Sequence, residues 1–316
     1  MTTAQTTLRT TSLPVGLLKA CRPKQWAKNA LLFVAPAAAG ALVRHGPNGV
    51  EIHGRAIAQT LLGLLVFCMI SSGTYLINDS VDVESDRLHP TKRNRPIAAG
   101  IVPIRLAVGF SVFLIASGLG LALWRSWQFC VVAAIYVVQT TLYSFWLKNQ
   151  PVLDLVALSG GFIVRLLAGA VVVDVGISDW FFVISCFGAL FVAVGKRLAE
   201  KRELGAEPGE IRKTLAIYTE PYLKFLQAVS PGTVLIAYVE WARSRASVLT
   251  DLHHSTAGVL TEVSILPFIV AILRYALLVE LGQGSAPEDV LGRDRQMQLI
   301  GLVWVVLAGF GFFYGQ

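Results

Sequence analysis

Three aspartates and an asparagine lie close together near residue 80, at spacings that suit one face of a helix. They are Asn78, Asp79, Asp82 and Asp86. At about 100° per residue the three aspartates fall within an arc of about 60°, so their negative charges repel one another. A divalent cation removes this repulsion, and carboxylate oxygens shared with substrate phosphates are the usual surroundings of Mg²⁺. The pattern therefore predicts a Mg²⁺ site that binds a diphosphate.

The main alternative for this acidic motif is a solvent-exposed end of a helix. We disfavour it because the motif directly follows residues 56–77, an apolar stretch long enough to cross a membrane. We therefore predict that the three aspartates are catalytic and bind the metal. The residues of this segment predicted to contact the substrate are Asn78 and Tyr75.

Several cations occur where they could face the acidic motif. The loop that follows it carries Lys92, Arg93 and Arg95, and arginine binds phosphate well through two parallel hydrogen bonds. An ordinary basic cytoplasmic loop is the alternative, but its position next to the aspartates favours phosphate binding. Residues of other segments complete the predicted substrate site: Lys24, Lys28, Tyr143, Lys148, Asp154, Arg165, Lys196, Arg197, Glu200 and Arg274.

Two of these arginines, Arg165 and Arg274, fall inside apolar stretches, where an arginine is costly and by default marks a functional site. For Arg165 the alternative is an ion pair with an acid elsewhere in the chain. For Arg274 the alternative is a side chain that extends to the cytoplasmic surface. Asp154 precedes a span, where it could bind a ribose hydroxyl or a metal, or cap the helix.

The segments that must position these residues are hydrophobic. Of the 316 residues, 54% are hydrophobic and 15% are charged, against about 25% charged in soluble domains. A membrane-spanning helix needs about 20 apolar residues, and we count nine candidate stretches. Their bounds are roughly 29–43, 56–77, 97–123, 128–147, 152–174, 179–195, 222–242, 259–280 and 297–315. We expect a single all-α integral membrane domain over residues 15–316, after a disordered polar tail over residues 1–14.

The lysines and arginines are unevenly divided between the predicted loops. If the loops alternate across the membrane, one side carries 18 of them and the other side carries five. Cytoplasmic loops hold such an excess, which predicts a cytoplasmic N-terminus and active site and, after nine spans, an outside C-terminus. The net charge of +7 is thus explained without nucleic acid, and the four cysteines show no metal or disulfide spacing.

The acidic motif, followed by Lys92-Arg93-x-Arg95-Pro96-Ile97, resembles the first signature of the UbiA family of intramembrane prenyltransferases. The resemblance extends over essentially the whole chain. It implies nine helices around a central cavity that opens laterally to lipid, with Mg²⁺-diphosphate near the cytoplasmic mouth. It also implies a multi-pass enzyme of the cell membrane.

The chain departs from this family where most members carry a second aspartate-rich motif. It has Gly195-Lys196-Arg197 there instead. A substrate site with acidic residues on one side and basic residues on the other suits a substrate with phosphates at both ends. A basic loop that is attracted to anionic lipids is an equal alternative. Together with the segment Arg22-Pro23-Lys24-Gln25-Trp26, this departure resembles the branch of the family that transfers phosphoribose to a polyprenyl phosphate.

This second resemblance implies the transfer of 5-phosphoribose from phosphoribosyl diphosphate to decaprenyl phosphate, with release of diphosphate, for the arabinose donors of cell-wall synthesis. Mg²⁺ is the implied cofactor. A conventional prenyltransferase that alkylates an aromatic acceptor is the alternative enzyme. An anion transporter is the alternative from another class. The sequence leaves the polyprenyl length and the oligomeric state open, a homo-oligomer included.

Overall fold

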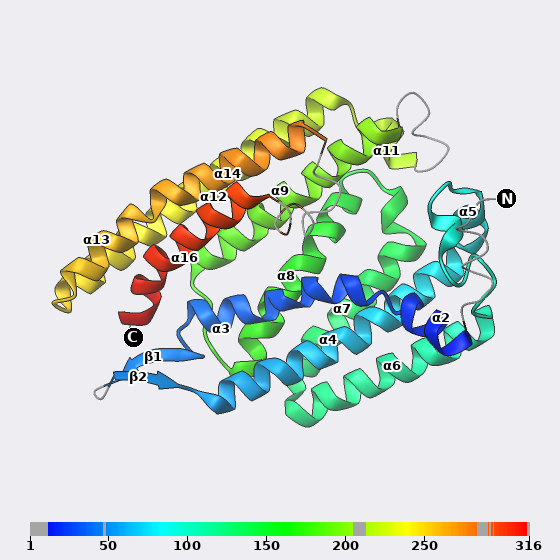
Figure 1. The fold of residues 1–316 in the computed structure, drawn as a ribbon, viewed down its shortest axis with the longest axis horizontal. Coiled ribbons are helices and arrows are strands. Elements are labelled where there is room, and N and C mark those ends of the chain that lie inside the picture. Colours follow the sequence, from blue (N-terminus) through cyan, green and yellow to red (C-terminus); the bar gives the residue numbers. More distant parts are fainter. Residues whose placement is uncertain are drawn as a thin grey trace.

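The computed structural model describes residues 12–46, 49–204, 213–282 and 294–314, together with residues 290 and 292. The predicted tail therefore lies outside the described residues up to residue 11, and helix α2 already begins at Leu13. The long helices run between two ends of the molecule (Figure 1). The β hairpin lies at one end, and the short helices α2, α5 and α11 lie at the other.

The described chain is almost entirely helical. Its first half consists of α2 (Leu13–Ala20), the 3₁₀ helix η1 (Pro23–Phe33), α3 (Val34–Ala38), strands β1 (Val43–Gly46) and β2 (Gly49–Ile52), α4 (Gly54–Val81), α5 (Val83–Leu88), η2 (Lys92–Asn94), α6 (Ile104–Arg125), α7 (Trp127–Phe145) and η3 (Leu147–Asn149). Its second half consists of α8 (Leu153–Val173), α9 (Asp179–Leu204), α11 (Lys213–Ile217), α12 (Glu220–Asp251), α13 (Ser255–Val263), α14 (Ile265–Glu280) and α16 (Arg295–Tyr314). The two strands pair antiparallel, with Val43 opposite Ile52.

Six helices in the described part of the chain are long and apolar enough to cross a membrane. They are α4, α6, α7, α8, the Asp179–Arg202 part of α9, and the stretch Ser255–Glu280 that α13 and α14 form together. Helix α12 is about 48 Å long at 1.5 Å per residue but does not meet the same criterion, and the apolar helix Arg295–Phe310 is shorter. The prediction of an all-helical, multi-pass membrane protein is confirmed, whereas the count of nine spans is not.

The predicted first span, residues 29–43, is not one α-helix. The 3₁₀ helix η1 continues to Phe33, α3 adds five residues, and β1 begins at Val43. Gly40 ends α3 with a φ of 62°, a left-handed conformation that glycine adopts without steric cost. The apolar residues that predicted a span, such as Leu32 and Ala35, pack inside the protein.

The predicted third span is also shorter than expected. Helix α6 begins at Ile104 rather than near Ile97, because Pro96 and Pro103 interrupt the helical path before it. Ile97 and Val102 are buried, in a small core cluster with residues of α2, α4 and α5. This cluster anchors the loop that carries Arg95 beside the end of α4.

A cavity of about 940 Å³ lies among α3, α8, α9, α12, α14 and α16. Its walls are mostly apolar, with the aromatic side chains of Tyr238 and Trp304 among them. Phe162 and Leu166 line it from α8, about 12 and 18 Å along the helix from Asp154. The cavity therefore lies deeper in the bundle than the polar residues around Asp154.

Helix η1 approaches α8 closely at Gly169. A Cβ atom at this position would lie 2.0 Å from the carbonyl oxygen of Leu32, so no larger residue fits unless η1 moves. On the α4 side, a Cβ at Gly63 would lie 3.0 Å from the Leu32 side chain. These two glycines allow the 3₁₀ helix to lie directly against both α4 and α8.

We therefore expect Gly169→Ala to lower the free energy of unfolding by about 1–3 kcal/mol, because η1 must shift to admit the methyl group. Thermal unfolding of the purified protein in detergent measures the change. The matched control is Gly120→Ala in α6, where an added Cβ meets nothing within 4 Å, and which should be neutral or slightly stabilising. Equal effects of the two variants would contradict the close approach.

Candidate active site

The acidic motif lies at the junction of α4 and α5. Helix α4 ends at Val81, and Asp82 connects it to α5. Backbone hydrogen bonds from Asp82 N to Asn78 O, at 2.9 Å, and from Asp86 N to Asp82 O, at 2.8 Å, keep the helical path nearly continuous. Asp79 and Asp86 are 2% and 3% exposed, so both carboxylates need a compensating cation.

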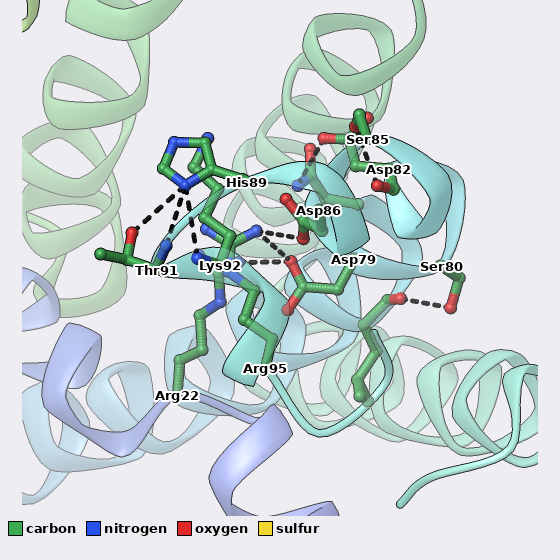
Figure 2. A network of polar contacts seen from close by, with 12 residues as sticks. Arg22, Asp79, Ser80, Asp82, Ser85, Asp86, His89, Thr91, Lys92 and Arg95 are labelled. Atoms are coloured by element: carbon green, nitrogen blue, oxygen red, sulfur yellow. Dashed lines mark hydrogen bonds and ion pairs between the residues drawn. The ribbon is translucent and has the colours of Figure 1, made fainter. Parts of the chain in front are cut away.

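Arg95 supplies a cation to both carboxylates. The Arg95 guanidinium nitrogen Nη1 lies 3.1 Å from Asp79 Oδ1 and 2.6 Å from Asp86 Oδ2. Arg22 also forms an ion pair with Asp79 Oδ1, and Figure 2 shows the two arginines reaching Asp79 together. The Arg22 guanidinium lies 5.0 Å from the centre of the Tyr75 ring, which places Tyr75 beside these ion pairs, and its contact with the substrate stays a prediction.

Asp82 has a different partner. Its carboxylate binds Lys148 Nζ at 2.6 Å and accepts a hydrogen bond from Asn78 Nδ2 at 3.2 Å. Among the described residues, no group of three or more His, Cys, Asp or Glu side chains is arranged to hold a metal. In this structure Lys148 pairs with Asp82, whereas Arg95 pairs with Asp79 and Asp86, so the three aspartates do not share one cation.

The pair Asp79 and Asp86 nevertheless fits Mg²⁺. Both carboxylates contact the same positively charged nitrogen, so their oxygens already converge on one cation position. Mg²⁺ is usually bound by one or two carboxylates and completes its coordination with substrate phosphates and water. A set of three metal-binding aspartates stays a prediction.

The loop after α5 is ordered by local hydrogen bonds and brings Arg95 to this position. His89 Nδ1 accepts from the backbone nitrogens of Thr91, at 3.3 Å, and Lys92, at 3.4 Å (Figure 2). Arg87 Nε donates to the carbonyl oxygen of Ala98 at 3.2 Å. His89 thus shapes the loop.

Charges in this loop act on Asp86. Burial raises the pKa of the Asp86 carboxyl, and Arg95 and then Lys92 offset part of that rise. The structure therefore brings Lys92 and Arg95 to the acidic motif, as predicted. It leaves Arg93 exposed.

A second polar cluster surrounds Arg197, which is 0% exposed. Its guanidinium donates to Asp154 Oδ2 at 2.8 Å and to Glu200 Oε2 at 2.6 Å. It also donates to the Tyr143 hydroxyl at 2.7 Å. The Tyr218 hydroxyl donates to the other oxygen of Asp154, which is itself fully buried.

This cluster corrects the predicted role of Arg197. Its guanidinium pairs with two carboxylates, and none of its side chain is exposed. In this structure Arg197 is therefore not available to bind a phosphate. Asp154, Glu200 and Tyr143 are its partners. Lys196, one residue earlier, is half-buried.

Two residues that contact the predicted site residues were not themselves predicted from the sequence. Tyr218 lies in the short connection before α12, and no spacing links it to Asp154. Burial and its bond to Asp154 raise its pKa, so the phenol stays protonated and donates. Arg22 belongs to the basic segment in which we selected Lys24, which is exposed, and Lys28, which is half-buried.

The two arginines predicted inside spans are satisfied in different ways. Arg165 is buried and donates to three neutral acceptors, so no acid is among its hydrogen-bond partners: Asn29 Oδ1 at 2.8 Å, Gly161 O at 2.6 Å and the Tyr136 hydroxyl at 2.7 Å. Arg274 binds Asp294 at 2.6 Å and ties α14 to the start of α16. The structure therefore gives Arg274 a partner outside the acidic motif.

The UbiA prenyltransferase family model matches residues 33–302, which is most of the chain. The chain belongs to the UbiA prenyltransferase family. The family resemblance predicted from the acidic motif is therefore confirmed.

The chain is also similar in sequence to three proteins that share one name. The chain is 39% identical over 306 residues to decaprenyl-phosphate phosphoribosyltransferase of Mycolicibacterium smegmatis, covering 96% of this chain and 94% of that protein. It is 40% identical to the Corynebacterium glutamicum protein of the same name over 296 residues, covering 93% and 86%. It is 38% identical to the Mycobacterium tuberculosis protein over 305 residues, covering 96% of each chain.

Solved structures show the same fold. A UbiA homolog from Archaeoglobus fulgidus bound to GPP and Mg²⁺ superposes with a TM-score of 0.62 at 18% identity, covering 94% of this chain and 98% of that chain. A UbiA homolog from Aeropyrum pernix K1 superposes with a TM-score of 0.57 at 13% identity, covering 92% and 97%. At these identities the likeness establishes the UbiA fold alone.

The cluster predicts that Arg197→Ala lowers the free energy of unfolding by about 3–5 kcal/mol, because it leaves the fully buried carboxylate of Asp154 without its cation. Thermal unfolding in detergent measures this loss. The control is Glu84→Gln, which breaks an exposed pair with Arg87 and should cost at most about 1 kcal/mol. A stable Arg197→Ala protein with weakened substrate binding would instead restore the role predicted from the sequence.

Proposed function

We propose that this chain transfers the 5-phosphoribosyl group of phosphoribosyl diphosphate to decaprenyl phosphate and releases diphosphate. The observation that carries the proposal is the 38–40% identity to decaprenyl-phosphate phosphoribosyltransferases over at least 93% of the chain. The site supports it, because buried carboxylates and three cations meet at the end of α4.

In the proposed site, Asp79 and Asp86 hold Mg²⁺, with Asp82 and Asn78 beside them. Bound Mg²⁺ stabilises negative charge on the departing diphosphate. The four oxygen-bearing side chains are hard ligands of the kind that Mg²⁺ prefers.

Arg22 and Arg95 are the proposed ligands of the diphosphate oxygens. Both already lie at the carboxylates, so the arrival of a more highly charged anion lets each guanidinium exchange a carboxylate oxygen for a phosphate oxygen. Arginine suits this role because its planar fork binds phosphate through two hydrogen bonds. Lys148 reaches the site from η3. In the segment Gly195-Lys196-Arg197, Lys196 is the residue that we propose binds the 5-phosphate.

In the transfer step, an oxygen of the lipid phosphate attacks C1 of the ribose. The bond from C1 to the diphosphate oxygen breaks, and its electron pair leaves with the diphosphate. The ring oxygen stabilises positive charge at C1, and direct displacement inverts the configuration there. A phosphate monoester is already anionic, so the step needs no general base, and alignment and electrostatics supply the catalysis.

The apolar cavity is the proposed place for part of the polyprenyl chain. Its volume of about 940 Å³ and its mostly apolar walls suit a hydrocarbon. It lies deeper in the bundle than Asp154, so a lipid chain in it leaves the phosphate at the polar end.

We place the polar end of the molecule on the cytoplasmic side of the cell membrane. Arg22 and Arg95 pair with Asp79 and Asp86 at the junction of α4 and α5. Helices α2, α5 and α11 lie at this same end of the bundle (Figure 1). The excess of basic residues in the corresponding loops is typical of the cytoplasmic face. Phosphoribosyl diphosphate then reaches the site from the cytoplasm, and the product enters cell-wall synthesis as an arabinose-donor precursor.

Two substrate pairs offered to the purified protein test this proposal. With phosphoribosyl diphosphate and decaprenyl phosphate we expect a lipid-linked phosphoribose and one diphosphate released per product, both lost when Mg²⁺ is chelated. With geranyl diphosphate and 4-hydroxybenzoate we expect no product. Turnover of the second pair alone would favour a conventional prenyltransferase, and anion flux through vesicles without turnover would favour a transporter.

Asp79→Asn tests the acidic motif. We expect a loss of at least about 100-fold in the rate of diphosphate release, because the change removes a charge at the proposed metal position. Glu84→Gln is the control within the same segment, since Glu84 is 81% exposed and pairs outward with Arg87. A folded Asp79→Asn protein with full activity would remove this carboxylate from the mechanism.

A further inference from the structure

We infer that Arg165, in the middle of α8, is a positioning residue that acts through η1 to place Arg22 at Asp79. The inference rests on the proposed function only where it concerns the kinetics of the phosphoribosyl donor. Its structural basis is a chain of contacts from Arg165 to Asn29, along η1, and from Arg22 to Asp79.

Different contacts hold the two ends of η1: α4 at Arg22, and both α4 and α8 at Asn29. Arg22 precedes the first turn, with a left-handed φ of 54°, and its guanidinium reaches Asp79 on α4. A non-glycine residue in this conformation costs energy and persists only where its surroundings hold it. Seven residues further on, Asn29 is fully buried and accepts the hydrogen bond from Arg165.

The spacing of the contacts along η1 depends on 3₁₀ geometry. Trp26 donates to Ser72 at 3.0 Å, Asn29 binds Arg165, and Leu32 packs on Gly169. With three residues per turn these positions lie on one face, whereas in an α-helix they would spread over about 120°. The 11 residues of η1 are an uncommon length for a 3₁₀ helix, so these contacts must hold it in this form.

The form of η1 sets the reach of Arg22. At about 2.0 Å per residue, the seven residues from Asn29 to Arg22 span about 14 Å. An α-helix would span about 10.5 Å, which would withdraw Arg22 by about 3.5 Å. A shift of this size would separate the Arg22 guanidinium from Asp79 unless its side chain readjusts. We therefore expect the anchor at Asn29, together with the hydrogen bond that Ser72 donates to the carbonyl oxygen of Cys21 at 3.1 Å, to set the position of Arg22.

Arg165 is suited to be this anchor because its planar guanidinium donates hydrogen bonds in several fixed directions. Its three bonds join η1, its own helix α8 and the Tyr136 hydroxyl of α7. All three acceptors are neutral, although a charge inside the membrane is expensive. The planar guanidinium fixes three directions at once, which a lysine ammonium cannot reproduce. Gly169, one turn further along α8, holds Leu32 on the same side.

A double-mutant cycle between the two ends of η1 tests the inference. We expect Asn29→Ala and Arg22→Gln each to raise the KM for phosphoribosyl diphosphate about tenfold. If Arg165 and Asn29 act through Arg22, the double variant is no worse than Arg22→Gln alone. Arg165→Lys keeps the charge and should behave like Asn29→Ala. Independent, additive effects would overturn the inference.

Ser111→Ala is the matched control for lost stability. It removes a buried hydrogen bond of similar length, 2.8 Å to Gly73 O, between α6 and α4. We expect it to lower the unfolding temperature without changing the KM for the donor. A rise in this KM equal to that of Asn29→Ala would show that general destabilisation is sufficient, and would also overturn the inference.

Alkylation of Cys21 separates this inference from the proposed function. Cys21 is buried next to Arg22, and iodoacetamide labelling followed by mass spectrometry requires no turnover. We expect faster labelling in Asn29→Ala and Arg165→Lys than in Ser111→Ala. Failure of phosphoribosyl transfer with this labelling pattern intact would contradict the proposed function alone. Unchanged labelling in both variants would contradict the coupling through η1.

Discussion

The buried carboxylate of Asp79, held between Arg22 and Arg95, is the interaction on which the arrangement of the site depends. An ionised carboxylate away from water requires a cation, and here the two cations come from segments on either side of α4 in the sequence. Their contact with one oxygen brings η1 and the loop before α6 together over the end of α4. The hydrophobic cluster in which Ile97 and Val102 pack with α2 also fixes this loop. A ligand that replaces these cation contacts therefore acts on both segments at once.

The cluster around Arg197 shows how a similar pair of charges can serve structure instead. The Arg197 guanidinium pairs with both Asp154 and Glu200, and Tyr143 and Tyr218 satisfy remaining hydrogen bonds. This cluster joins α7, α8 and α9, and its buried guanidinium is not accessible to a ligand. The difference from the Asp79 site is exposure, because Arg22 and Arg95 each keep about a quarter of their side chains accessible. Only the accessible cations can exchange partners when a phosphate arrives.

The interrupted first segment connects the polar site with the membrane interior. Helix η1 contacts the acidic motif at its first end and Arg165 in the middle of α8 near its other end, and the α3 segment that follows lines the apolar cavity. A continuous α-helix of the same residues could not make all these contacts, because its turns do not repeat every three residues. The close approach at Gly169 and Gly63 makes this geometry possible. The segment thus borders both the place proposed for the phosphates and the place proposed for the lipid chain.

Local patterns in the sequence determined the membrane class, the helical fold and the acidic motif, because each depends on residues that are near one another in the sequence. The spacing of Asp79, Asp82 and Asp86 is such a property, and so are the apolar lengths of α4, α6, α7 and α8. Apolar length alone could not show that residues 29–43 do not form one continuous α-helix, or that α6 begins only at Ile104. The tertiary structure also decided which cation meets which acid. Arg22 and Asp79 are 57 residues apart, and Arg197 and Asp154 are 43 apart. The sign of a charge can be read from the sequence, but its partner and its exposure depend on which helices pack together. The partner and the exposure in turn determine whether an arginine is available to a ligand or is part of a buried ion-pair cluster.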